Sequence, residues 1–216
     1  MGQRATARRG KHETPYQRAR DAGRQALRDA VLQTAGEVLA REGAGALTMR
    51  RIADRIGSST TVLYAVFDGK NSIIDAMVRE GHDLLRERLE AIPPSDDAFA
   101  RLAATGVAYR EAALADPARY QLMFGNAIPG YLPSETAREA ARLSFDALVS
   151  AVRDCIEAGV FKKSTEPRFA AEILLAAAHG AVSLELSGHF DDAGRSDERF
   201  AVVTAGSVQP FLADRR

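Results

Sequence analysis

Hydroxyl-bearing side chains are concentrated in one short stretch of the chain, and they suit contacts with DNA. The stretch contains Ser58, Ser59, Thr60, Thr61 and Tyr64. Hydroxyls donate hydrogen bonds to phosphate oxygens and exchange them with base edges. Serine and threonine are only moderate helix formers, and a helix surface selected for stability alone would carry Ala, Glu or Lys instead. The composition of this stretch therefore indicates contact with nucleic acid.

A short helix and a tight turn are expected to precede the hydroxyls. Thr48 can cap this helix with its side chain. The apolar side chains that follow recur at the spacing of one helix face: Met49, Ile52, Ala53 and Ile56. Gly57 suits the positive φ at a helix C-terminus. The chain can therefore turn sharply just before the hydroxyl-rich stretch.

A second short helix is expected to carry the hydroxyls, with Ser58 or Ser59 as its cap. Its buried stripe is Leu63, Val66 and Phe67, and Asp68-Gly69 ends it. The free N–H groups and positive dipole at its start favour phosphate. One interpretation is a helix-turn-helix whose second helix enters the major groove. The other is an ordinary αα-hairpin inside a helical bundle, because short motifs often match by chance.

The stretch resembles the DNA-binding domain of the tetracycline-repressor (TetR/AcrR) family. That family has Thr-x-x-x-Ile-Ala, then Gly-x-Ser, then Leu-Tyr-x-x-Phe, then a Lys that opens a long fourth helix. The matching positions are Thr48, Ile52, Ala53, Gly57, Ser59, Leu63, Tyr64, Phe67 and Lys70. The resemblance covers about residues 24–90. It implies a homodimeric transcriptional regulator, usually a repressor that a small ligand releases from DNA.

The resemblance also implies which residues contact DNA. The family uses the positions of Thr48, Tyr64 and Lys70 at phosphates. The candidates for reading bases are Ser58, Thr60, Thr61 and Val62, next to Ser59. Residues 58–67 contain no Arg, Lys, Asn or Gln, so the strong bidentate base contacts are missing. We therefore expect modest direct readout, supplemented by DNA shape or by arginines outside this helix such as Arg50 and Arg51.

The charge distribution fits a DNA-binding N-terminal part. Net charge over the whole chain is +0, but residues 1–70 hold 13 Lys+Arg against 7 Asp+Glu, whereas residues 71–216 hold 16 against 22. A basic part on an acidic remainder favours nucleic acid at one end of the molecule. Residues 1–22 are polar and arginine-rich, so we expect a disordered basic arm. Its role is open between a DNA contact and a solubilising tail.

The rest of the chain predicts an all-α fold of about nine helices. We expect a helix over residues 23–41, the two short helices above, and helices over 70–91, 95–116, 117–124, 134–158, 166–187 and 196–213. The resulting division is a basic arm at 1–22, a three-helix DNA-binding domain at 23–70, and a ligand-binding and dimerisation bundle at 71–216.

The effector pocket of such a regulator is expected among the fourth to eighth helices. The candidate lining residues are Met77, Tyr109, Tyr120, Met123, Phe124, Phe145, Leu148 and His179. Each of them is also an ordinary core candidate. His179-Gly180 and the run from Asp116 to Phe124 bear a fainter resemblance to a ligand-domain subgroup named for a Trp-His-Gly signature, although the chain contains no tryptophan.

The family pairs two subunits on a near-palindromic operator, because one short helix reads too few bases. The helices at 134–158 and 166–187 are the expected interface. Their small residues include Ala170, Ala171, Ala176, Ala177, Ala178, Gly180 and Ala181. These residues allow close packing, either between subunits or within one subunit.

Other function classes find little support in the sequence. Four histidines and Cys155 show no metal-ligand spacing, and no nucleophile–base pair or phosphate loop marks an enzyme or a cofactor site. No signal peptide and no 18-residue apolar run is expected, so we predict a cytoplasmic protein that does not enter a membrane. The alternative function is a ligand-binding helical module that has weak or lost specific DNA binding.

Overall fold

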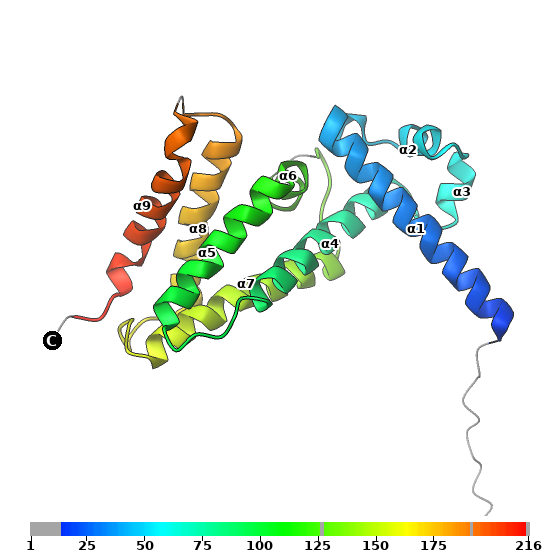
Figure 1. The fold of residues 1–216 in the computed structure, drawn as a ribbon. Helices are drawn as coiled ribbons and strands as arrows, with labels where there is room; N and C mark the ends of the chain where they lie inside the picture. Colours follow the sequence, from blue (N-terminus) through cyan, green and yellow to red (C-terminus); the bar gives the residue numbers. More distant parts are fainter. Residues whose placement is uncertain (1–13, 126–127, 191, 215–216) are drawn as a thin grey trace, which may run out of the picture.

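The computed structural model describes residues 14–125, 128–190 and 192–214 (Figure 1). This part of the chain forms nine α-helices: α1 (Pro15–Glu42), α2 (Met49–Ile56), α3 (Thr60–Tyr64), α4 (Lys70–Glu90), α5 (Ala98–Ala115), α6 (Pro117–Phe124), α7 (Glu135–Glu157), α8 (Pro167–Leu186) and α9 (Ser196–Val208). Its only β structure is an isolated bridge between Phe161 and Leu212. The all-α prediction is confirmed for these residues.

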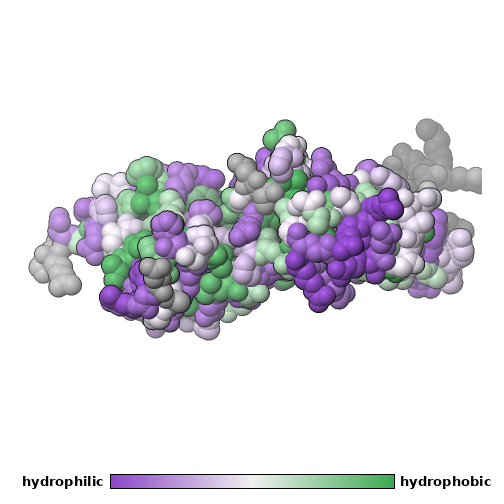
Figure 2. All heavy atoms as spheres, turned by 90° about the horizontal axis from the view of Figure 1, so that it is seen from above, coloured by the Kyte–Doolittle hydropathy of each residue, from purple (hydrophilic) through white to green (hydrophobic). Residues whose placement is uncertain are grey.

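The helices form two parts joined by α4. Figure 1 shows α1, α2 and α3 at one end of the molecule and α5 to α9 at the other, with α4 running from the first part along α7 of the second. Hydrophilic side chains crowd over the N-terminal part in Figure 2, whereas hydrophobic patches are visible over the C-terminal helices. One helix of 21 residues therefore connects the two parts mechanically.

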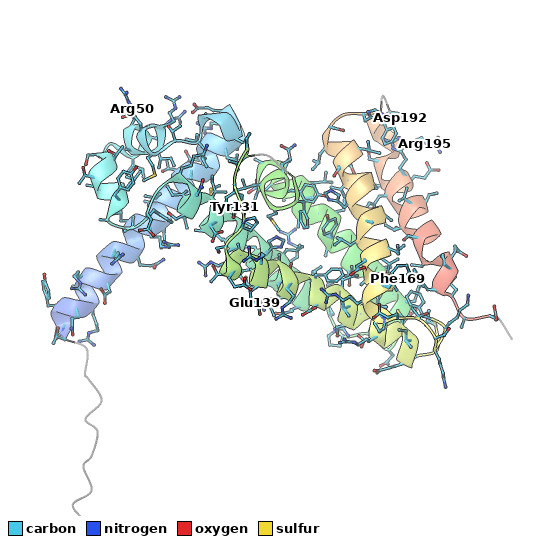
Figure 3. The ribbon with its side chains drawn as sticks, turned by 180° about the vertical axis from the view of Figure 1, so that it is seen from behind. Arg50, Tyr131, Glu139, Phe169, Asp192 and Arg195 are labelled. Carbon is cyan, nitrogen blue, oxygen red and sulfur yellow. The ribbon has the colours of Figure 1, made fainter. Side chains whose placement is uncertain are left out.

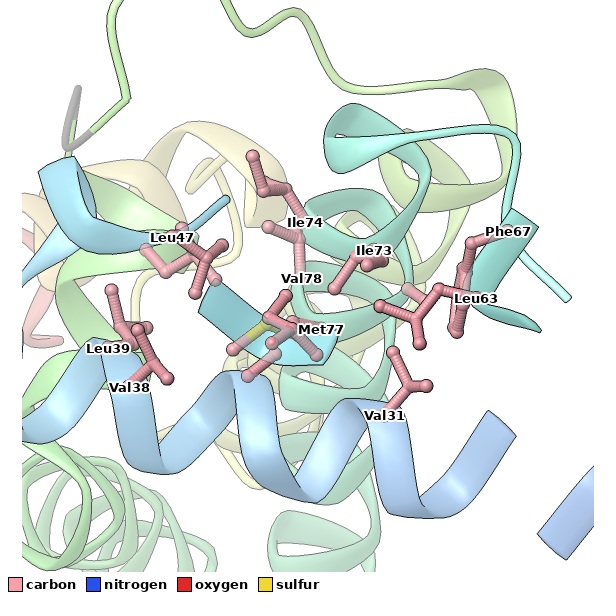
Figure 4. Packing of buried hydrophobic residues seen from close by; sticks show 14 of the residues in the cluster. Val31, Val38, Leu39, Leu47, Leu63, Phe67, Ile73, Ile74, Met77 and Val78 are labelled. Carbon is pink, nitrogen blue, oxygen red and sulfur yellow. The ribbon is translucent and has the colours of Figure 1, made fainter. Parts of the chain in front are cut away.

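The N-terminal part has its own hydrophobic core (Figure 4). Fully buried side chains reach it from α1, α3 and α4: Val31, Val38, Leu63, Ile73 and Ile74. The first turns of α4 belong to this core. The packed N-terminal part therefore extends beyond the expected boundary at residue 70. The short helices α2 and α3 depend on this core, since helices of 8 and 5 residues are not stable alone.

The first helix begins earlier than the sequence interpretation placed it. Thr14 accepts a hydrogen bond from the Gln17 N–H, the Gln17 side chain accepts one from the Thr14 N–H, and Pro15 occupies the first helical position. This capping box starts α1 at Pro15. The prediction of disorder is therefore wrong for residues 15–22, and residues 1–13 of the expected arm lie outside the described residues.

Two other helices need comment, α9 for its end and α8 for its hydropathy. α9 stops at Val208 instead of reaching Ala213, because Pro210 cannot donate a backbone hydrogen bond and a short 3-10 turn follows. α8 has the length and mean hydropathy, 1.4, of a membrane-spanning helix. Composition alone is weak evidence here, since Ala170, Ala171 and Val182 of α8 are buried against the rest of the bundle.

Candidate DNA-binding surface and effector cavity

The turn between α2 and α3 has the geometry that its sequence predicts. The Thr48 side chain accepts a hydrogen bond from the Arg51 N–H at 3.1 Å and caps α2. Gly57 ends the helix with φ 72° and ψ 35°, a left-handed conformation that favours glycine. The predicted cap and the predicted positive φ are both confirmed. They place α3 directly after α2, at the outer end of the N-terminal part.

The buried side of α3 holds it in place and leaves the other side exposed. Leu63 is fully buried, and Phe67 just beyond the helix is 3% exposed. Val62 and Tyr64 are 39% and 55% exposed, and Thr61 is exposed between them and the helix start. The expected hydroxyl surface therefore faces outward from a buried apolar anchor.

Neither serine before α3 caps it with a side chain. Ser59 holds the predicted N-cap position, but its hydroxyl makes no cap hydrogen bond. Ser59 is exposed, and Ser58 and Thr60 are half-buried. No hydrogen bond to another described residue uses these three hydroxyls. They remain able to contact an external partner at the start of α3.

The cations around this surface are not equally available. Arg50 is exposed and extends from α2 away from the fold in Figure 3, and it makes no ion pair with a described residue. Arg51 donates to Glu42 at 2.9 Å and Arg55 donates to the same carboxylate at 2.6 Å. Lys70 is half-buried at the start of α4. Of the two arginines proposed to supplement α3, Arg50 is available and Arg51 is engaged by Glu42.

The C-terminal part encloses a cavity of about 790 Å³. All six helices from α4 to α9 contribute to its lining, which is mostly apolar. Leucine and phenylalanine side chains dominate its walls, among them Leu85, Leu102, Phe124, Phe145 and Phe200. Its volume is in the range of small-molecule sites, which are typically apolar with a few polar groups. The sequence placed the pocket among the fourth to eighth helices and missed the contribution of α9.

Five of the eight candidate pocket residues line this cavity: Tyr109, Met123, Phe124, Phe145 and Leu148. Tyr120 and His179 are not in its lining and lie beside Tyr109. Met77 needs correction, because it is 2% exposed in the core of the N-terminal part. The helical spacing correctly predicted that Met77 is buried on α4. The first half of that helix, however, packs in the core of the N-terminal part and not around the cavity.

A chain of buried and partly buried hydrogen bonds supports one wall of the cavity. The hydroxyls of Tyr109 and Tyr120 lie 3.0 Å apart, and the Tyr120 hydroxyl lies 2.6 Å from Nδ1 of His179. His179 Nε2 lies 3.3 Å from the Ser183 hydroxyl. Burial raises the pKa of both tyrosines and lowers the pKa of His179. The chain is therefore neutral near pH 7 and joins α5, α6 and α8.

His82 is a cavity residue that the sequence analysis did not select. It lies on α4 with 4% exposure, and its Nδ1 is 3.0 Å from the Ser144 hydroxyl of α7. Burial lowers the pKa of His82 to about 4, so the imidazole is neutral at physiological pH. The signal was present in the sequence, because Val78, His82 and Leu85 follow helical spacing and place this histidine on the apolar stripe.

An ion-pair cluster stands where the cavity meets the surface. Arg110 of α5 pairs with Glu185 of α8 at 2.7 Å and with Asp197 of α9 at 2.7 Å. The hydrogen bonds that Arg110 donates to Glu185 are the main reason that the pKa of Arg110 is raised. Both partners neutralise the only cation in the lining, so the described walls offer no unpaired positive charge.

An apolar stripe on α8 is exposed to solvent. Phe169, Ile173 and Leu184 are 55%, 38% and 41% exposed, and Ala176 and Gly180 share their helix face. On α9, which packs beside α8, Val202 and Val203 are 65% and 41% exposed. Phe169 is labelled on α8 in Figure 3. Exposed apolar side chains therefore lie on neighbouring faces of α8 and α9, and α5 carries a further set in Phe99, Val107 and Leu114.

The packing of α7 differs from the sequence-based expectation of an interface helix. Its apolar and small residues, including Ala137, Ala140, Val149 and Val152, are buried against α4, α5 and α8. Leu143 is its one described large apolar side chain with substantial exposure. Ala170, Ala171 and Ala178 of α8 are likewise buried within the subunit. α7 therefore has no broad apolar face left for a second subunit.

The described residues contain no cluster of side chains suited to binding a metal ion. No group of three or more His, Cys, Asp or Glu side chains there could hold a metal ion. Cys155 is fully buried in the C-terminal core, and burial raises its pKa to about 11. It behaves as a small apolar core residue.

The fold and the two sites define a helix-turn-helix regulator that joins a DNA-binding domain to a helical ligand-binding domain. A family model described as bacterial regulatory proteins of the tetR family matches residues 31–77. A second, described as the tetracyclin repressor-like C-terminal domain, matches residues 102–206. The two matches together cover more than half of the chain. The chain belongs to the tetR family of transcriptional regulators, which are not enzymes.

Individual relatives agree with this assignment. The HTH-type transcriptional regulator Rv1816 of Mycobacterium tuberculosis is 28% identical over 150 residues, which are 65% of this chain and 60% of that protein. The chain thus matches less than two thirds of the length of its curated relatives. The crystal structure of regulatory protein SCO4313 has 29% identity and a TM-score of 0.73, covering 88% of this chain and 98% of its own. A Rhodococcus sp. RHA1 protein with unknown function has 27% identity, a TM-score of 0.76, and coverages of 87% and 96%.

Proposed function

We propose that this regulator is a homodimeric repressor that leaves a near-palindromic operator when a small apolar molecule fills the cavity. The observation that carries the proposal is the continuity of α4. Its first turns are buried in the core under α3, and its later turns supply His82, Leu85 and Leu89 to the cavity wall. A ligand that shifts this helix changes the position of the DNA-binding surface.

DNA contact is assigned to residues on and around α3. Ser58, Ser59, Thr60, Thr61 and Val62 at the start of the helix reach base edges, and Thr48, Tyr64 and Lys70 reach phosphates. Exposure of Thr61, Val62 and Tyr64 supports these roles. Arg50 adds the cation that α3 itself lacks. Because hydroxyls and a valine make weaker base contacts than Arg or Asn, DNA shape supplies part of the specificity.

The homodimer forms through the exposed apolar stripe of α8 together with α9. A contiguous exposed apolar surface on a soluble domain marks an interaction site. Pairing the two helices with their symmetry mates makes a self-complementary interface. The operator lies on the chromosome, so the protein acts in the cytoplasm, with no membrane partner.

The effector is an uncharged or weakly polar molecule. About 790 Å³ of mostly apolar space suits a molecule of drug-like size. A carboxylate would lie without a cation to balance it, since Arg110 is already held by Glu185 and Asp197. Tyr109, Met123, Phe124, Phe145 and Leu148 contact the molecule, while Tyr120 and His179 hold Tyr109 in place.

Linkage provides the mechanism of release. The ligand must prefer a conformer in which the two α3 helices are wrongly spaced for the operator. Arg119 of α6 forms an ion pair with Glu80 of α4 at 3.1 Å and another with Asp116, the N-cap residue of α6, at 3.0 Å. Movement of α6 is therefore transmitted to α4. Coupling of this kind is typically worth about 1–3 kcal/mol, or about 5–150-fold in affinity.

A binding experiment with the chain's own upstream DNA tests the proposal. Fluorescence anisotropy should show tight binding of a palindromic segment and much weaker binding of a scrambled duplex. Addition of N-phenylnaphthylamine, an uncharged apolar fluorescent probe, should release the specific complex. Equal affinity for all duplexes would instead support a ligand-binding module without specific DNA binding. A variant with a filled cavity, Gly106→Leu, should bind DNA but ignore the probe.

A further inference from the structure

We infer that the projecting N-terminal half of α1 is a second DNA-contacting element, in which Arg20 and Arg24 bind phosphates of DNA flanking each half-site. This inference rests on the proposed DNA binding and extends it beyond the bases under α3. The occupant of this helix face is the duplex backbone. Four independent features of the described residues support it: charge, exposure, orientation and the lack of an apolar face.

The first half of α1 is the most positively charged stretch among the described N-terminal residues: residues 14–28 have a net charge of +3, and the helix-turn-helix at residues 48–70 has +2. Residues 14–28 hold four arginines and one acidic residue, whereas residues 29–70 hold five basic and five acidic residues. Two of those five basic residues, Arg51 and Arg55, are further neutralised by Glu42. Phosphate contacts supply most of the non-specific affinity of DNA-binding proteins. Within the helix-turn-helix, Arg50 and Lys70 remain as cations that Glu42 does not neutralise, so the arginines in the first half of α1 can supply further phosphate contacts.

The projecting half of α1 has no partner within the described chain. Every residue from 14 to 26 is exposed, and the first half-buried residue is Leu27. Figure 1 shows this part of α1 extending past α3 and away from the rest of the fold. Its 12 helical residues from Pro15 span about 18 Å. A helix of this length without tertiary contacts is marginal in water, yet a capping box starts it.

The orientation of α1 is set by Arg28, which lies against the end of α3. Its guanidinium donates to the Val66 carbonyl at 3.2 Å and stacks over the Phe67 ring at 4.3 Å from the centroid. Residues four apart share a helix face. Arg24 and Arg20 therefore continue this side of α1 outward from the end of α3. Arg18 lies about 120° around the helix from Arg24 and points elsewhere.

The projecting half also lacks the apolar stripe that a protein groove would require. Tyr16 is the one large apolar side chain from 14 to 26, and it is 75% exposed. Arg20 pairs with the adjacent Asp21 at 3.3 Å, with both side chains more than half exposed. Exposed pairs of this kind contribute little and yield readily to a stronger anion. A polyanion fits this surface and a second protein chain does not.

Shortened operators test the inference directly. One duplex carries full flanks, and a second lacks about five base pairs outside each half-site, the length that about 18 Å of helix covers at 3.4 Å per pair. Wild-type protein should bind the full duplex about tenfold more tightly than the short one, for two lost contacts per subunit. The variant Arg24→Gln should lose most of this preference. The matched variant Arg18→Gln, with the same charge removed from the other face, should keep it.

Salt dependence provides the second readout. Each lost phosphate contact lowers the slope of log affinity against log salt by about 0.9, so Arg24→Gln in a dimer should lower it by about 2. Circular dichroism should show unchanged helicity in both variants. The inference is overturned if wild type ignores the flanks, if the two variants behave alike, or if Arg24→Gln alters the oligomeric state instead. Failure to bind any operator would overturn the proposed function itself.

Discussion

Gly81 of α4 and Met123 of α6 lie so close together that a Cβ at position 81 would come within 2.5 Å of the Met123 sulfur. Met123 lines the cavity, and Gly81 is buried in the helix that reaches the core of the DNA-binding part. A ligand that displaces Met123 must therefore press against the α4 backbone or be accommodated elsewhere in the wall. This contact couples the α6 wall of the cavity to the linking helix, in addition to the α4 side chains that line the cavity directly.

Adding a methyl group at this contact should separate its structural and functional roles. We expect Gly81→Ala to keep the free energy of unfolding within about 1 kcal/mol of wild type, since its helix propensity gain of about 1 kcal/mol offsets movement of a flexible thioether. Binding of N-phenylnaphthylamine should weaken several-fold, because Met123 is pushed toward the cavity. Urea unfolding and dye titration measure the two effects.

The matched control is Gly106→Ala, where an added Cβ meets only the Phe200 ring at 3.9 Å. It brings the same propensity gain into a cavity-lining helix without displacing a neighbour. Equal dye affinity in the two variants would contradict the role assigned to the contact between Gly81 and Met123.

The buried imidazole of His82 should make stability fall in acid. Burial holds its pKa at about 4 in the folded protein, against 6.5 for an unperturbed histidine. Between these values the unfolded chain binds a proton that the folded protein does not, so folding loses stability as pH falls from about 6.5 to 4 and levels off below. The full loss is about 3 kcal/mol. The variant His82→Gln should show a shallower decline in urea unfolding over this range.

Replacement of an exposed histidine provides the comparison for that titration. His189 is exposed beyond the end of α8, so His189→Gln should keep the wild-type pH dependence. A decline that is equally steep in His82→Gln would place the acid sensitivity on other groups.

Local signals in the sequence were sufficient for much of the fold. The cap at Thr48 and the glycine at position 57 predicted the ends of α2 to within a few residues. α1 was misplaced because the capping box at Thr14, Pro15 and Gln17 was hidden in a polar segment without apolar periodicity. The spacing of apolar residues indicates only helices that bury one face. The first half of α1 is helical but exposed, so it lacks that signal.

The candidate sites were predicted less evenly, for a physical reason. Exposure on α3 follows from helix period, so the hydroxyl surface was visible in the sequence. Period alone does not say which core a buried residue joins, and Met77 and His82 lie on the same helix in different cores. Likewise, the ion pair between Arg51 and Glu42 joins residues on different helices, and no local sequence pattern predicts such a pair.

Releasing the two arginines held by Glu42 should strengthen non-specific DNA binding. The hydrogen bond from Arg51, with that from Arg55, holds the pKa of Glu42 below its ordinary value, so the carboxylate is charged at pH 7. Glu42→Gln should raise affinity for a random duplex several-fold and steepen its salt dependence. Glu37→Gln removes an equal charge from an exposed position of α1 and should have a smaller effect. Identical effects would mean that net charge, and not the arginines, is responsible.

A single charge on the exposed stripe should dissociate the proposed homodimer. Val202 is 65% exposed on α9 within the subunit, so Val202→Glu costs the monomer little stability but buries a carboxylate at the interface. Sedimentation should then report a monomer at concentrations where wild type is a dimer. Leu132→Glu is the control, because this side chain is 85% exposed in the loop before α7, away from α8 and α9. Dimerisation through another surface would leave Val202→Glu dimeric.

The carboxylate of Asp75 should be the residue that fixes the start of α7 to α4. It accepts hydrogen bonds from the Tyr131 hydroxyl at 2.9 Å, and from the Ser134 N–H and hydroxyl at 2.8 and 2.6 Å. Partial burial acts to raise its pKa, but these hydrogen bonds outweigh it and the pKa is lowered. The stabilisation is therefore present above the ordinary aspartate pKa and is lost as pH falls below it.

Removing that charge should cost about 2 kcal/mol, the scale of a hydrogen bond to a charged group, because Asp75→Asn presents a donor where Ser134 also donates. The loss should appear in urea unfolding at pH 7 and shrink as the pH falls below the ordinary aspartate pKa and through the lowered pKa of Asp75 in the folded protein. Glu87→Gln, on an exposed position of the same helix, should change stability by less than about 0.5 kcal/mol. A loss for Asp75→Asn that is independent of pH would mean that side-chain shape, and not the charge, joins the two helices.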